Sequence, residues 1–379
     1  MENGIFHSKI FKFLLKIPNF AAYNTYILMR FLSPPMLELL KQIVAIPSVS
    51  RDEGACADYL ENYMRSKGLT PQREANNVWC VGSKQLPSRP TLLLNAHIDT
   101  VKPVAGWNRK PFEPQFEDGR LYGLGTNDCG GGLVALLFAF MQLDAEDEGQ
   151  LPYNLVYLAS AEEEVSGRNG IERALPLLPA IDVALVGEPT AMQPAIAEKG
   201  LMVLDCTAEG KAGHAAREEG VNAIYKALPD IEWLRSHEFE RVSPLLGKVK
   251  MSVTQIQAGT QHNVVPDACT FVVDVRTNEC YSNLEILEEI QAHLQCNAQA
   301  RSTRLNSSRI DAGHPLIQRC IQMGRQPFGS PTLSDQALMS FPSFKLGPGN
   351  SSRSHTADEF ICVSELEEAL QFYLDLLRG

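Results

Sequence analysis

Four short apolar runs, each bounded by turn residues, alternate with helical stretches over residues 36–195. The runs are NVWCVG, TLLLNAHID, YNLVYLASAEEE and DVALVGEPT, and a long apolar helical stretch, GGGLVALLFAFMQL, lies between the second and the third. Strands that alternate with helices at this spacing are typical of a mostly parallel sheet with helices on both faces. The sequence therefore predicts an α/β fold, in which ligands bind at the carboxyl ends of the strands.

The pattern changes near residue 195. The segments GLMVLDCTAEG, KVKMSVTQIQAG and CTFVVDVRTN alternate apolar and polar residues, as half-buried strands do, and two helical stretches lie among them. Beyond residue 306, two further helical runs resemble the first part of the chain. We predict a discontinuous catalytic domain, residues 36–195 and 306–379, with a smaller α+β domain inserted at residues 196–305.

The first 35 residues differ from the rest in charge, because they carry a net charge of +3 while the whole chain carries −11. They contain no run of about 18 apolar residues that could span a bilayer, and no clear signal peptide. A basic amphipathic segment on a membrane surface is one interpretation. We favour a start codon assigned too far upstream, because the amphipathic pattern begins at Met36, directly after Pro34-Pro35. Residues 1–35 are thus expected to be an extension outside the enzyme, and a membrane partner is not expected.

Charge and cysteine usage exclude several classes of function. With 34 basic and 45 acidic side chains, the chain has no broad basic field for nucleic acid. Its nine cysteines are scattered and form no C-x-x-C pair, which argues against a disulfide framework and against a cysteine zinc finger. This usage fits a reducing compartment, and we expect a cytoplasmic protein.

Polar residues follow several of the predicted strands. His97 and Asp99 end the run LLLNAHIDT, and side chains two residues apart on a strand face the same side. A carboxylate in that position can orient a histidine that binds a metal. Asp128, in GLGTNDCGGG, directly precedes the long apolar helix. The alternatives are a solvated loop end for the first pair and a helix N-cap for Asp128.

Three consecutive glutamates, Glu162, Glu163 and Glu164, follow the apolar strand LVYLAS. A metal ion would relieve their mutual repulsion and would let one of them act as a general base. The alternative is an acidic run on the surface. Glu188 ends the next apolar run, and His355 lies in SRSHTADEF, far along the chain. One open sheet would bring these side chains together, and nitrogen and oxygen ligands without thiolates suit Zn²⁺ or another divalent transition ion.

The segments HID, GTNDCGGG, AEEE, GEPT and SHTADE, in this order and spacing, resemble the dimetal amidohydrolase family. That family includes acetylornithine deacetylase, succinyl-diaminopimelate desuccinylase, aminoacylase and carboxypeptidase G, and the resemblance covers residues 36–379. It implies a zinc-peptidase-like catalytic domain, two Zn²⁺ or Co²⁺ ions, and a lid domain that forms a homodimer. The resemblance implies that Asp128 bridges both ions and is followed by a cis peptide. It also implies that Asp99 orients His97 and that Glu162 is the general base. The implied metal ligands are His97, Asp128, Glu163, Glu188 and His355.

The resemblance also assigns residues outside the metal site. His214, in KAGHAA, corresponds to a lid histidine that polarises the substrate carbonyl, usually in the neighbouring subunit. Asn263 and Arg276 match lid residues that contact the substrate, and Gly347 and Gly349 match a substrate-facing loop. For Asn263 and Arg276 the alternatives are a turn residue and an ion-paired surface arginine.

One position departs from the family pattern. Relatives commonly have Asp-x-Lys-Gly-Gly, whereas Gly130 stands here in place of the lysine. The adjacent Cys129 is interpreted as a small packed residue and not as a nucleophile. The change removes a cation near the site, which can alter substrate preference.

The resemblance implies metal-dependent hydrolysis of an N-acyl amino acid, a small molecule. The first expectation is deacetylation of N-acetylornithine in arginine biosynthesis, which rests on the segments SRSHTADE and AEKGLMVLD. Alternatives within the family are N-succinylornithine or N-acyl-citrulline deacylase, succinyl-diaminopimelate desuccinylase and a dipeptidase. From other classes, the alternatives are a noncatalytic ligand-binding relative and a membrane-associated scaffold.

Overall fold

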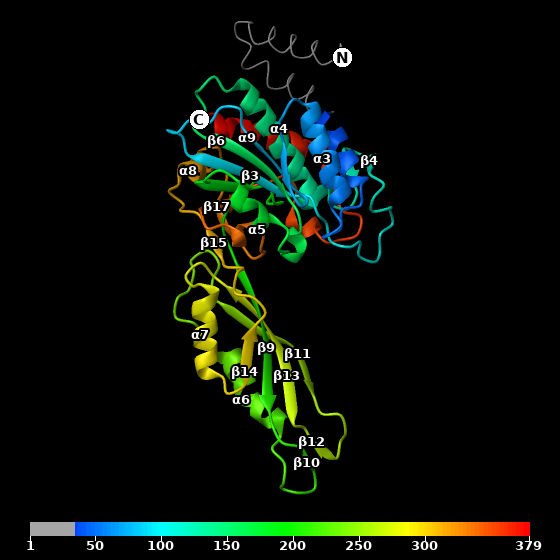
Figure 1. The fold of residues 1–379 in the computed structure, drawn as a ribbon, viewed down its shortest axis with the longest axis vertical. Helices are drawn as coiled ribbons and strands as arrows, with labels where there is room; N and C mark the ends of the chain where they lie inside the picture. The colour runs from blue at the N-terminus through cyan, green and yellow to red at the C-terminus, as the bar shows by residue number, and fades with distance from the viewer. Residues whose placement is uncertain (1–34) are drawn as a thin grey trace.

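The computed structural model describes residues 35–379, and they form two units (Figure 1). The larger unit contains both the N-terminal and the C-terminal parts of this range, and the smaller unit is built from the segment between them. The predicted N-terminal extension, residues 1–35, lies outside the described range except for Pro35. Residues 35–44 form a helix, in agreement with the amphipathic pattern that begins at Met36.

A nine-stranded sheet forms the centre of the larger unit. Its middle strands, β6 (Asn154–Ser160), β3 (Thr91–His97), β7 (Val183–Val186) and β17 (Ser343–Lys345), are parallel neighbours in that order. The fold class predicted from the sequence is therefore confirmed. The outer strands are β1 (Gln72–Glu74), β2 (Asn77–Val81), β8 (Ala195–Glu198), β15 (Ser308–Arg309) and β16 (Phe328–Ser330).

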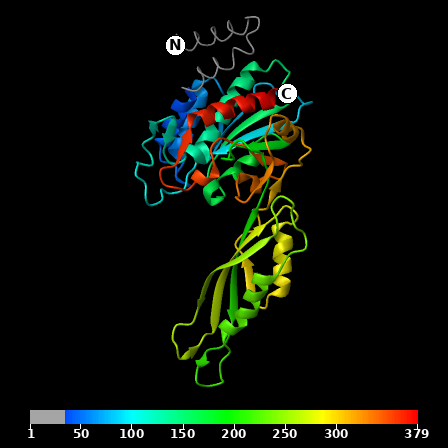
Figure 2. The ribbon, with the colours of Figure 1, turned by 180° about the vertical axis from the view of Figure 1, so that it is seen from behind.

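Helices cover both faces of this sheet, so its central strands are buried on both sides. On β3, Leu92, Leu94 and Ala96 face one hydrophobic cluster, and Leu93 faces another. The first cluster includes side chains of α3 (Gly54–Ser66), α4 (Gly131–Glu146), α8 (Pro315–Gln322) and α9 (Val363–Arg378). The second includes α5 (Ile171–Ala174). Figure 2 shows α9, in red, crossing the larger unit.

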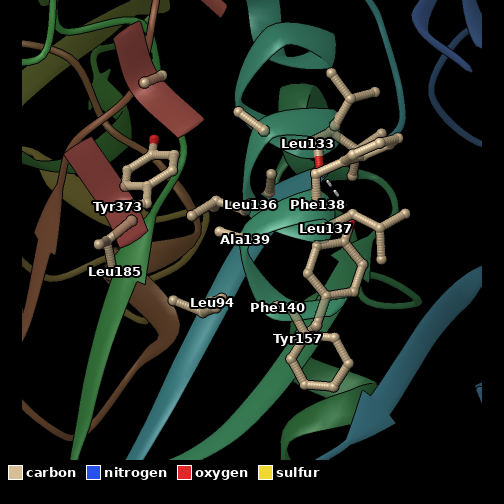
Figure 3. Packing of buried hydrophobic residues seen from close by; sticks show 14 of the residues in the cluster. Leu94, Leu133, Leu136, Leu137, Phe138, Ala139, Phe140, Tyr157, Leu185 and Tyr373 are labelled. Carbon is tan, nitrogen blue, oxygen red and sulfur yellow. Dashed lines mark hydrogen bonds between the residues drawn. The ribbon is translucent and has the colours of Figure 1, made fainter. Parts of the chain in front are cut away.

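Helix α4 lies at the centre of the first cluster (Figure 3). The Tyr157 hydroxyl of β6 donates a hydrogen bond of 3.1 Å to the Leu133 carbonyl, so that the start of the helix is attached to the sheet. Within residues 35–379, the segment Thr126–Glu146 alone is long and apolar enough to cross a membrane, and 72% of its apolar window is buried inside the protein. Its apolar character is accounted for by this core position.

The smaller unit contains a four-stranded antiparallel sheet in the order β11 (Lys250–Ala258), β13 (Ala268–Thr277), β9 (Gly200–Glu209) and β14 (Asn297–Ala300). Alternate residues of β9 and β13 pack against α6 (Ala223–Ser236) and α7 (Asn283–His293). The two-residue strands β10 (Gly213–His214) and β12 (Val264–Val265) pair at the end farthest from the larger unit (Figure 1). The strands and helices predicted for this segment are confirmed, and the domain boundaries at 195/196 and 305/306 stay a prediction.

A three-stranded sheet joins two parts of the chain that flank the site. It consists of β4 (Gln115–Glu117), β5 (Arg120–Tyr122) and β18 (Phe360–Cys362), and the sequence pattern did not predict it because each strand has only three residues. The pairing of β5 with β18 brings the segment before Asp128 next to the segment after His355. Two motifs that are more than 200 residues apart are thereby placed together.

Gly132 offers a test of how the core positions the strand ends. A Cβ atom at this position would lie 1.8 Å from the Gly187 carbonyl oxygen, directly before Glu188. We expect Gly132→Ala to lower the free energy of unfolding by about 2 kcal/mol or more, because overpacked backbone must move apart. Gly54→Ala is the control, since its Cβ meets only the Asn76 side chain, at 3.8 Å. Urea unfolding measures both, and equal midpoints would contradict the expectation.

Candidate metal centre

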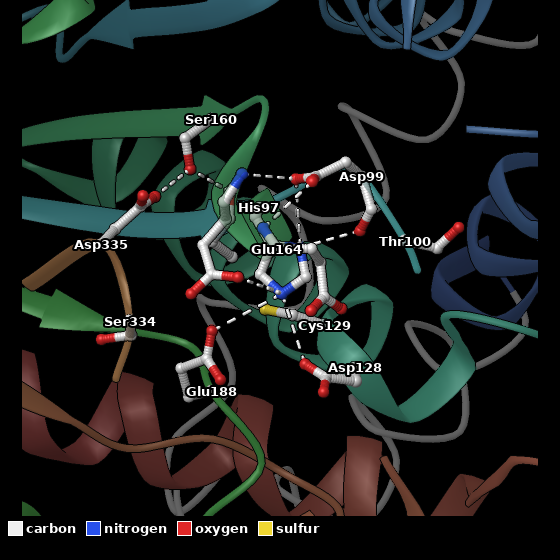
Figure 4. Close-up of polar contacts among 12 residues, drawn as sticks. His97, Asp99, Thr100, Asp128, Cys129, Ser160, Glu164, Glu188, Ser334 and Asp335 are labelled. Atoms are coloured by element: carbon white, nitrogen blue, oxygen red, sulfur yellow. Dashed lines mark hydrogen bonds and ion pairs between the residues drawn. The ribbon is translucent and has the colours of Figure 1, made fainter. Parts of the chain in front are cut away.

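Three predicted ligands meet where β3, β7 and the start of α4 come together. His97 is the last residue of β3, Glu188 follows β7, and Asp128 lies in the short turn η1 (Thr126–Gly130). The His97 Nε2 atom lies 3.3 Å from Asp128 Oδ1 and 3.6 Å from Glu188 Oε1 (Figure 4). The carboxyl ends of the strands thus converge as the α/β pattern predicted.

Asp128 faces a second group of side chains with its other oxygen. Asp128 Oδ2 lies 3.7 Å from His355 Nε2, and this nitrogen is 2.9 Å from Glu164 Oε2. Ligand atoms of Asp128, Glu164 and His355 all lie within 4.8 Å of one another, as do those of His97, Glu163 and Glu164. The peptide bond after Asp128 is cis, as the resemblance implies.

The acidic run is placed one residue differently from the expectation. Glu162 adopts a left-handed backbone, with a φ of 54°, and its carboxylate accepts hydrogen bonds from the Asn169 side chain and main chain. The neighbouring carboxylates of Glu163 and Glu164 are the ones that reach the cluster. The roles of Glu162 as base and Glu163 as metal ligand stay predictions, while the turn directs Glu162 toward Asn169 and leaves Glu163 and Glu164 at the cluster.

Asp99 fixes two parts of the site at once. Its carboxylate accepts hydrogen bonds from the Glu163 and Glu164 main-chain N–H groups, at 3.0 and 3.2 Å, and from the Ser50 hydroxyl at 2.7 Å. The His97 Nδ1 atom lies 2.8 Å from the Asp99 carbonyl oxygen and 3.5 Å from its carboxylate. Asp99 therefore orients His97 mainly through its main chain, while its side chain holds the glutamate turn.

Glu359 is a residue of the site that the sequence analysis did not single out. Its buried carboxylate accepts main-chain hydrogen bonds from Gly125, Asn127 and Asp128, at 3.1, 2.8 and 3.0 Å. Because Glu359 follows His355 by four residues, these hydrogen bonds attach the loop that carries His355 to the loop that carries Asp128. Its place in the quoted SHTADE segment was the available signal, but the contact itself depends on the tertiary structure.

The chemistry of this cluster fits divalent cations. Burial raises the pKa of Glu163 well above its usual value, and burial followed by the charge of Asp128 raises the pKa of Glu188 to about 8. The Glu188 Oε1 atom is buried and has no hydrogen-bond partner. Carboxylates crowded in this way are stabilised as anions when a cation lies between them. His97, Asp128, Glu164, Glu188 and His355 supply the oxygen and nitrogen donors that Zn²⁺ and Co²⁺ accept.

Cys129 and Gly130 are explained by packing. Burial raises the pKa of the Cys129 thiol well above its usual value, and its Sγ atom contacts the Gly187 carbonyl at 3.4 Å. A buried thiol that keeps its proton is a poor nucleophile, in agreement with the interpretation of Cys129 as a packed residue. At Gly130, a Cβ atom would lie 2.4 Å from the Gly125 carbonyl oxygen and 2.7 Å from Leu40. The space that a lysine side chain would need is therefore filled.

The other expected substrate contacts lie at three places. Gly347 packs against the main chain of Glu188, since a Cβ atom there would lie 2.5 Å from the Glu188 carbonyl oxygen. Arg276 is near the base of the smaller unit, where it pairs with Asp274 at 2.9 Å. His214 and Asn263 lie on or beside β10 and β12, at the distal tip. Within one chain, the last two are therefore not brought to the cluster.

The titration of the cluster predicts how pH acts on the metal-free protein. Its hydrogen bond with Glu164 raises the pKa of His355 to about 9, from a usual value of 6.5, and the pKa of Glu188 is about 8, from 4.5. Both groups keep protons in the folded state that the unfolded chain releases by pH 8. We therefore expect the melting temperature in chelator to fall between pH 6.5 and pH 8.5.

Added Zn²⁺ competes with these protons, so its stabilising effect should be larger at pH 8.5 than at pH 6.5. Differential scanning fluorimetry with chelator and with Zn²⁺ measures both quantities. Glu188→Gln should weaken the pH dependence in chelator. A metal-free protein that is equally stable at both pH values would contradict the assignment.

Comparison with known proteins agrees with this geometry. The sequence profile of peptidase family M20/M25/M40 matches residues 93–379. A tripeptidase from Staphylococcus aureus superposes with a TM-score of 0.72 at 20% identity, and the match covers 91% of this chain and 98% of that one. A putative aminohydrolase from methicillin-resistant S. aureus superposes with a TM-score of 0.74 at 16% identity, covering 92% and 98%.

A dinuclear metal-binding peptidase of the M20 family from Bacillus subtilis superposes with a TM-score of 0.68 at 17% identity, covering 91% of this chain and 97% of that one. At these identities the structures support the fold, whereas the profile match extends over most of the chain. Together with the histidines and carboxylates at the strand ends, this profile match shows that the chain belongs to peptidase family M20/M25/M40, as a metal-dependent hydrolase.

Proposed function

We propose that this chain hydrolyses the amide bond of a small N-acyl amino acid with two divalent metal ions, Zn²⁺ or Co²⁺. The observation that supports this best is the position of Asp128, whose two oxygens face two different sets of ligands. A carboxylate placed in this way suits a bridge between two ions in a hydrolytic site.

The ligand assignment follows from the contacts. His97, Asp128 and Glu188 would hold the first ion, and Asp128, Glu164 and His355 the second. Glu163 lies beside both sets, with its Oε2 atom 4.0 Å from His97 Nε2, and is assigned as the general base. This places each glutamate role one residue later than the sequence resemblance implied.

The residues divide the reaction between them. The bound ions would supply Lewis-acid polarisation and lower the pKa of a bound water. Glu163 takes the proton of the attacking water and returns it to the nitrogen of the leaving amine. Burial raises the pKa of its carboxyl group well above the usual value, which favours the uptake of the proton before it is returned to the amine. Asp99 and Glu359 position the ligand loops through hydrogen bonds to main-chain N–H groups.

The proposed substrate is N-acetylornithine, so that the reaction is deacetylation in arginine biosynthesis, in the cytoplasm. This rests on the resemblance carried by SRSHTADE and AEKGLMVLD. N-succinylornithine, N-acyl-citrulline and succinyl-diaminopimelate are the alternatives among acylated amino acids. A second candidate is di- or tripeptide hydrolysis, which is favoured by the structural similarity to a tripeptidase and to a dipeptidase from Saccharomyces cerevisiae.

A substrate panel tests the proposed reaction. Purified enzyme with Zn²⁺ or Co²⁺ is offered N-acetylornithine, N-succinylornithine, N-acetylcitrulline, N-succinyl-diaminopimelate, a dipeptide and a tripeptide. We expect release of ornithine from N-acetylornithine with the highest kcat/KM, measured by chromatography of the free amines. Preference for a peptide would support the second candidate, and no turnover of any acylated amino acid would refute the first.

The base assignment is tested by two neighbouring substitutions. Glu163→Gln should lower kcat by about a thousandfold or more, because it removes the proton acceptor while keeping the shape of the side chain. Glu162→Gln is the matched control and should change kcat by less than about fivefold, because its carboxylate faces Asn169. The reverse ranking would restore the original assignment of Glu162.

A homodimer would complete the site. His214 is exposed at the distal tip of the smaller unit, and the edge strand β11 next to it leaves Ile256 54% exposed. An exposed, apolar edge strand can pair with another chain. We propose that two smaller units associate through this region, and that each delivers His214 and Asn263 to the metal centre of the other chain. There His214 would donate a hydrogen bond to the developing oxyanion.

Complementation between two inactive variants tests the shared site. Glu163→Gln and His214→Ala are each expected to be nearly inactive, but a mixed dimer would contain one intact site. Mixing after reversible dissociation should restore up to about a quarter of wild-type activity. Mixing Glu163→Gln with His355→Ala is the control. Both changes lie in the same metal centre, so every site of a mixed dimer would carry one of them and should stay inactive. Restored activity in this mixture would contradict the model of a site shared through His214 alone.

A further inference from the structure

The turn that carries Glu163 and Glu164 is held at both ends. The short helical turn η2 (Glu163–Val165) begins with the two N–H groups that bind Asp99. It ends at Ser166, whose N–H donates to the Glu163 carbonyl at 2.8 Å and whose φ of 44° is left-handed. A non-glycine residue in this conformation must be stabilised by its surroundings.

Arg304 provides the contact at the far end of the turn. Its guanidinium donates a hydrogen bond to the Ser166 carbonyl oxygen and lies 3.1 Å from Glu172 Oε2. Glu172 belongs to α5, whose Ile171 and Ala174 are buried against the large sheet. The Arg304 side chain is only 20% exposed, so this contact is shielded from water more than a surface ion pair is.

Arg304 does not come from the larger unit's own sheet. It lies in residues 301–307, the return segment, which leads from β14 back to β15. Leu305 of this segment accepts a hydrogen bond from Leu201 N–H at 3.0 Å and one from the Asn283 side chain at 2.7 Å. The residue directly after Arg304 is therefore attached to β9 and to the start of α7, both in the smaller unit.

We propose that Arg304 is a positioning residue that couples the orientation of the smaller unit to the placement of the general base. A rotation of the smaller unit moves Leu305, and Arg304 transmits the displacement to Ser166 and to the turn that carries Glu163. The base thus reaches its working position when the smaller unit holds the orientation that binds substrate. This inference rests on the proposed function, because it takes Glu163 as the base.

The contact needs the geometry of an arginine. One guanidinium nitrogen binds the carbonyl of Ser166 while another faces the carboxylate of Glu172, and its planar fork holds the two in a fixed relation. A lysine can reach one partner or the other as a single point charge, so Arg304→Lys should recover only part of the effect.

The experiment compares Arg304→Ala and Arg304→Lys with Arg301→Ala in the full-length enzyme. Arg301 is a matched control, because it lies in the same segment but pairs with Asp205 of β9, at 2.8 Å, on the surface of the smaller unit. Arg304→Ala should lower kcat about tenfold while KM and metal content stay within twofold, and Arg304→Lys should fall between it and the wild type. Arg301→Ala should match the wild type.

Hydrogen exchange supplies a readout that does not depend on activity. In the metal-free protein, the Ser166 and Gly167 N–H groups, which bond within the turn, should exchange faster in Arg304→Ala than in the wild type or in Arg301→Ala. If Arg304→Ala is too unstable to assay, Glu172→Gln weakens the same contact and should shift exchange and kcat in the same direction.

The possible failures can be told apart. Unchanged exchange and kcat in Arg304→Ala, with Glu163→Gln inactive, would overturn the role of Arg304 and leave the base assignment intact. Full activity of Glu163→Gln would instead overturn the assignment of Glu163 as the general base, on which this inference rests. Equal losses of kcat in Arg304→Ala and Arg301→Ala would also overturn the inference, because they would show a general effect of charge in the return segment.

Discussion

Mutual repulsion among buried carboxylates is the constraint on which the site depends. Asp99, Asp128, Glu163, Glu164 and Glu188 all lie around two imidazoles at one edge of the sheet. A fold can hold them there only if their backbones are fixed before any cation arrives. Main-chain N–H groups bonded to Asp99 and Glu359 provide this fixation, and the strands beneath are buried on both faces. The acidic cluster and the rigid core are therefore two parts of one arrangement.

Much of this arrangement could be predicted from the sequence. The alternation of apolar runs and helices predicts the parallel centre of the sheet, and the polar residues that end the runs predict His97, Asp128 and Glu188 as neighbours. These predictions succeed because they depend on periodicity and on a general property of parallel sheets. The short strands β4, β5 and β18 carry too few residues for such a pattern, although they bring His355 to the site.

The acidic run shows where sequence reasoning stops. Three identical side chains in succession leave their register open by one residue, and the sequence contains no feature that selects among them. The choice is made by the left-handed backbone at Glu162 and by Asn169, which binds its carboxylate. Glu359 and Arg304 were missed for a related reason, since their partners are main-chain groups far away in the sequence.

The packing at Gly130 restricts which residues this position can accept. The Leu40 side chain, from the helix of residues 35–44, occupies the volume into which a residue at position 130 would extend. The two positions are therefore linked, and a lysine could return at 130 only together with a smaller residue at 40 and a shift of the Gly125 main chain. Each of these changes made alone is expected to lower the stability of the protein, so a cation at this position requires all of them together.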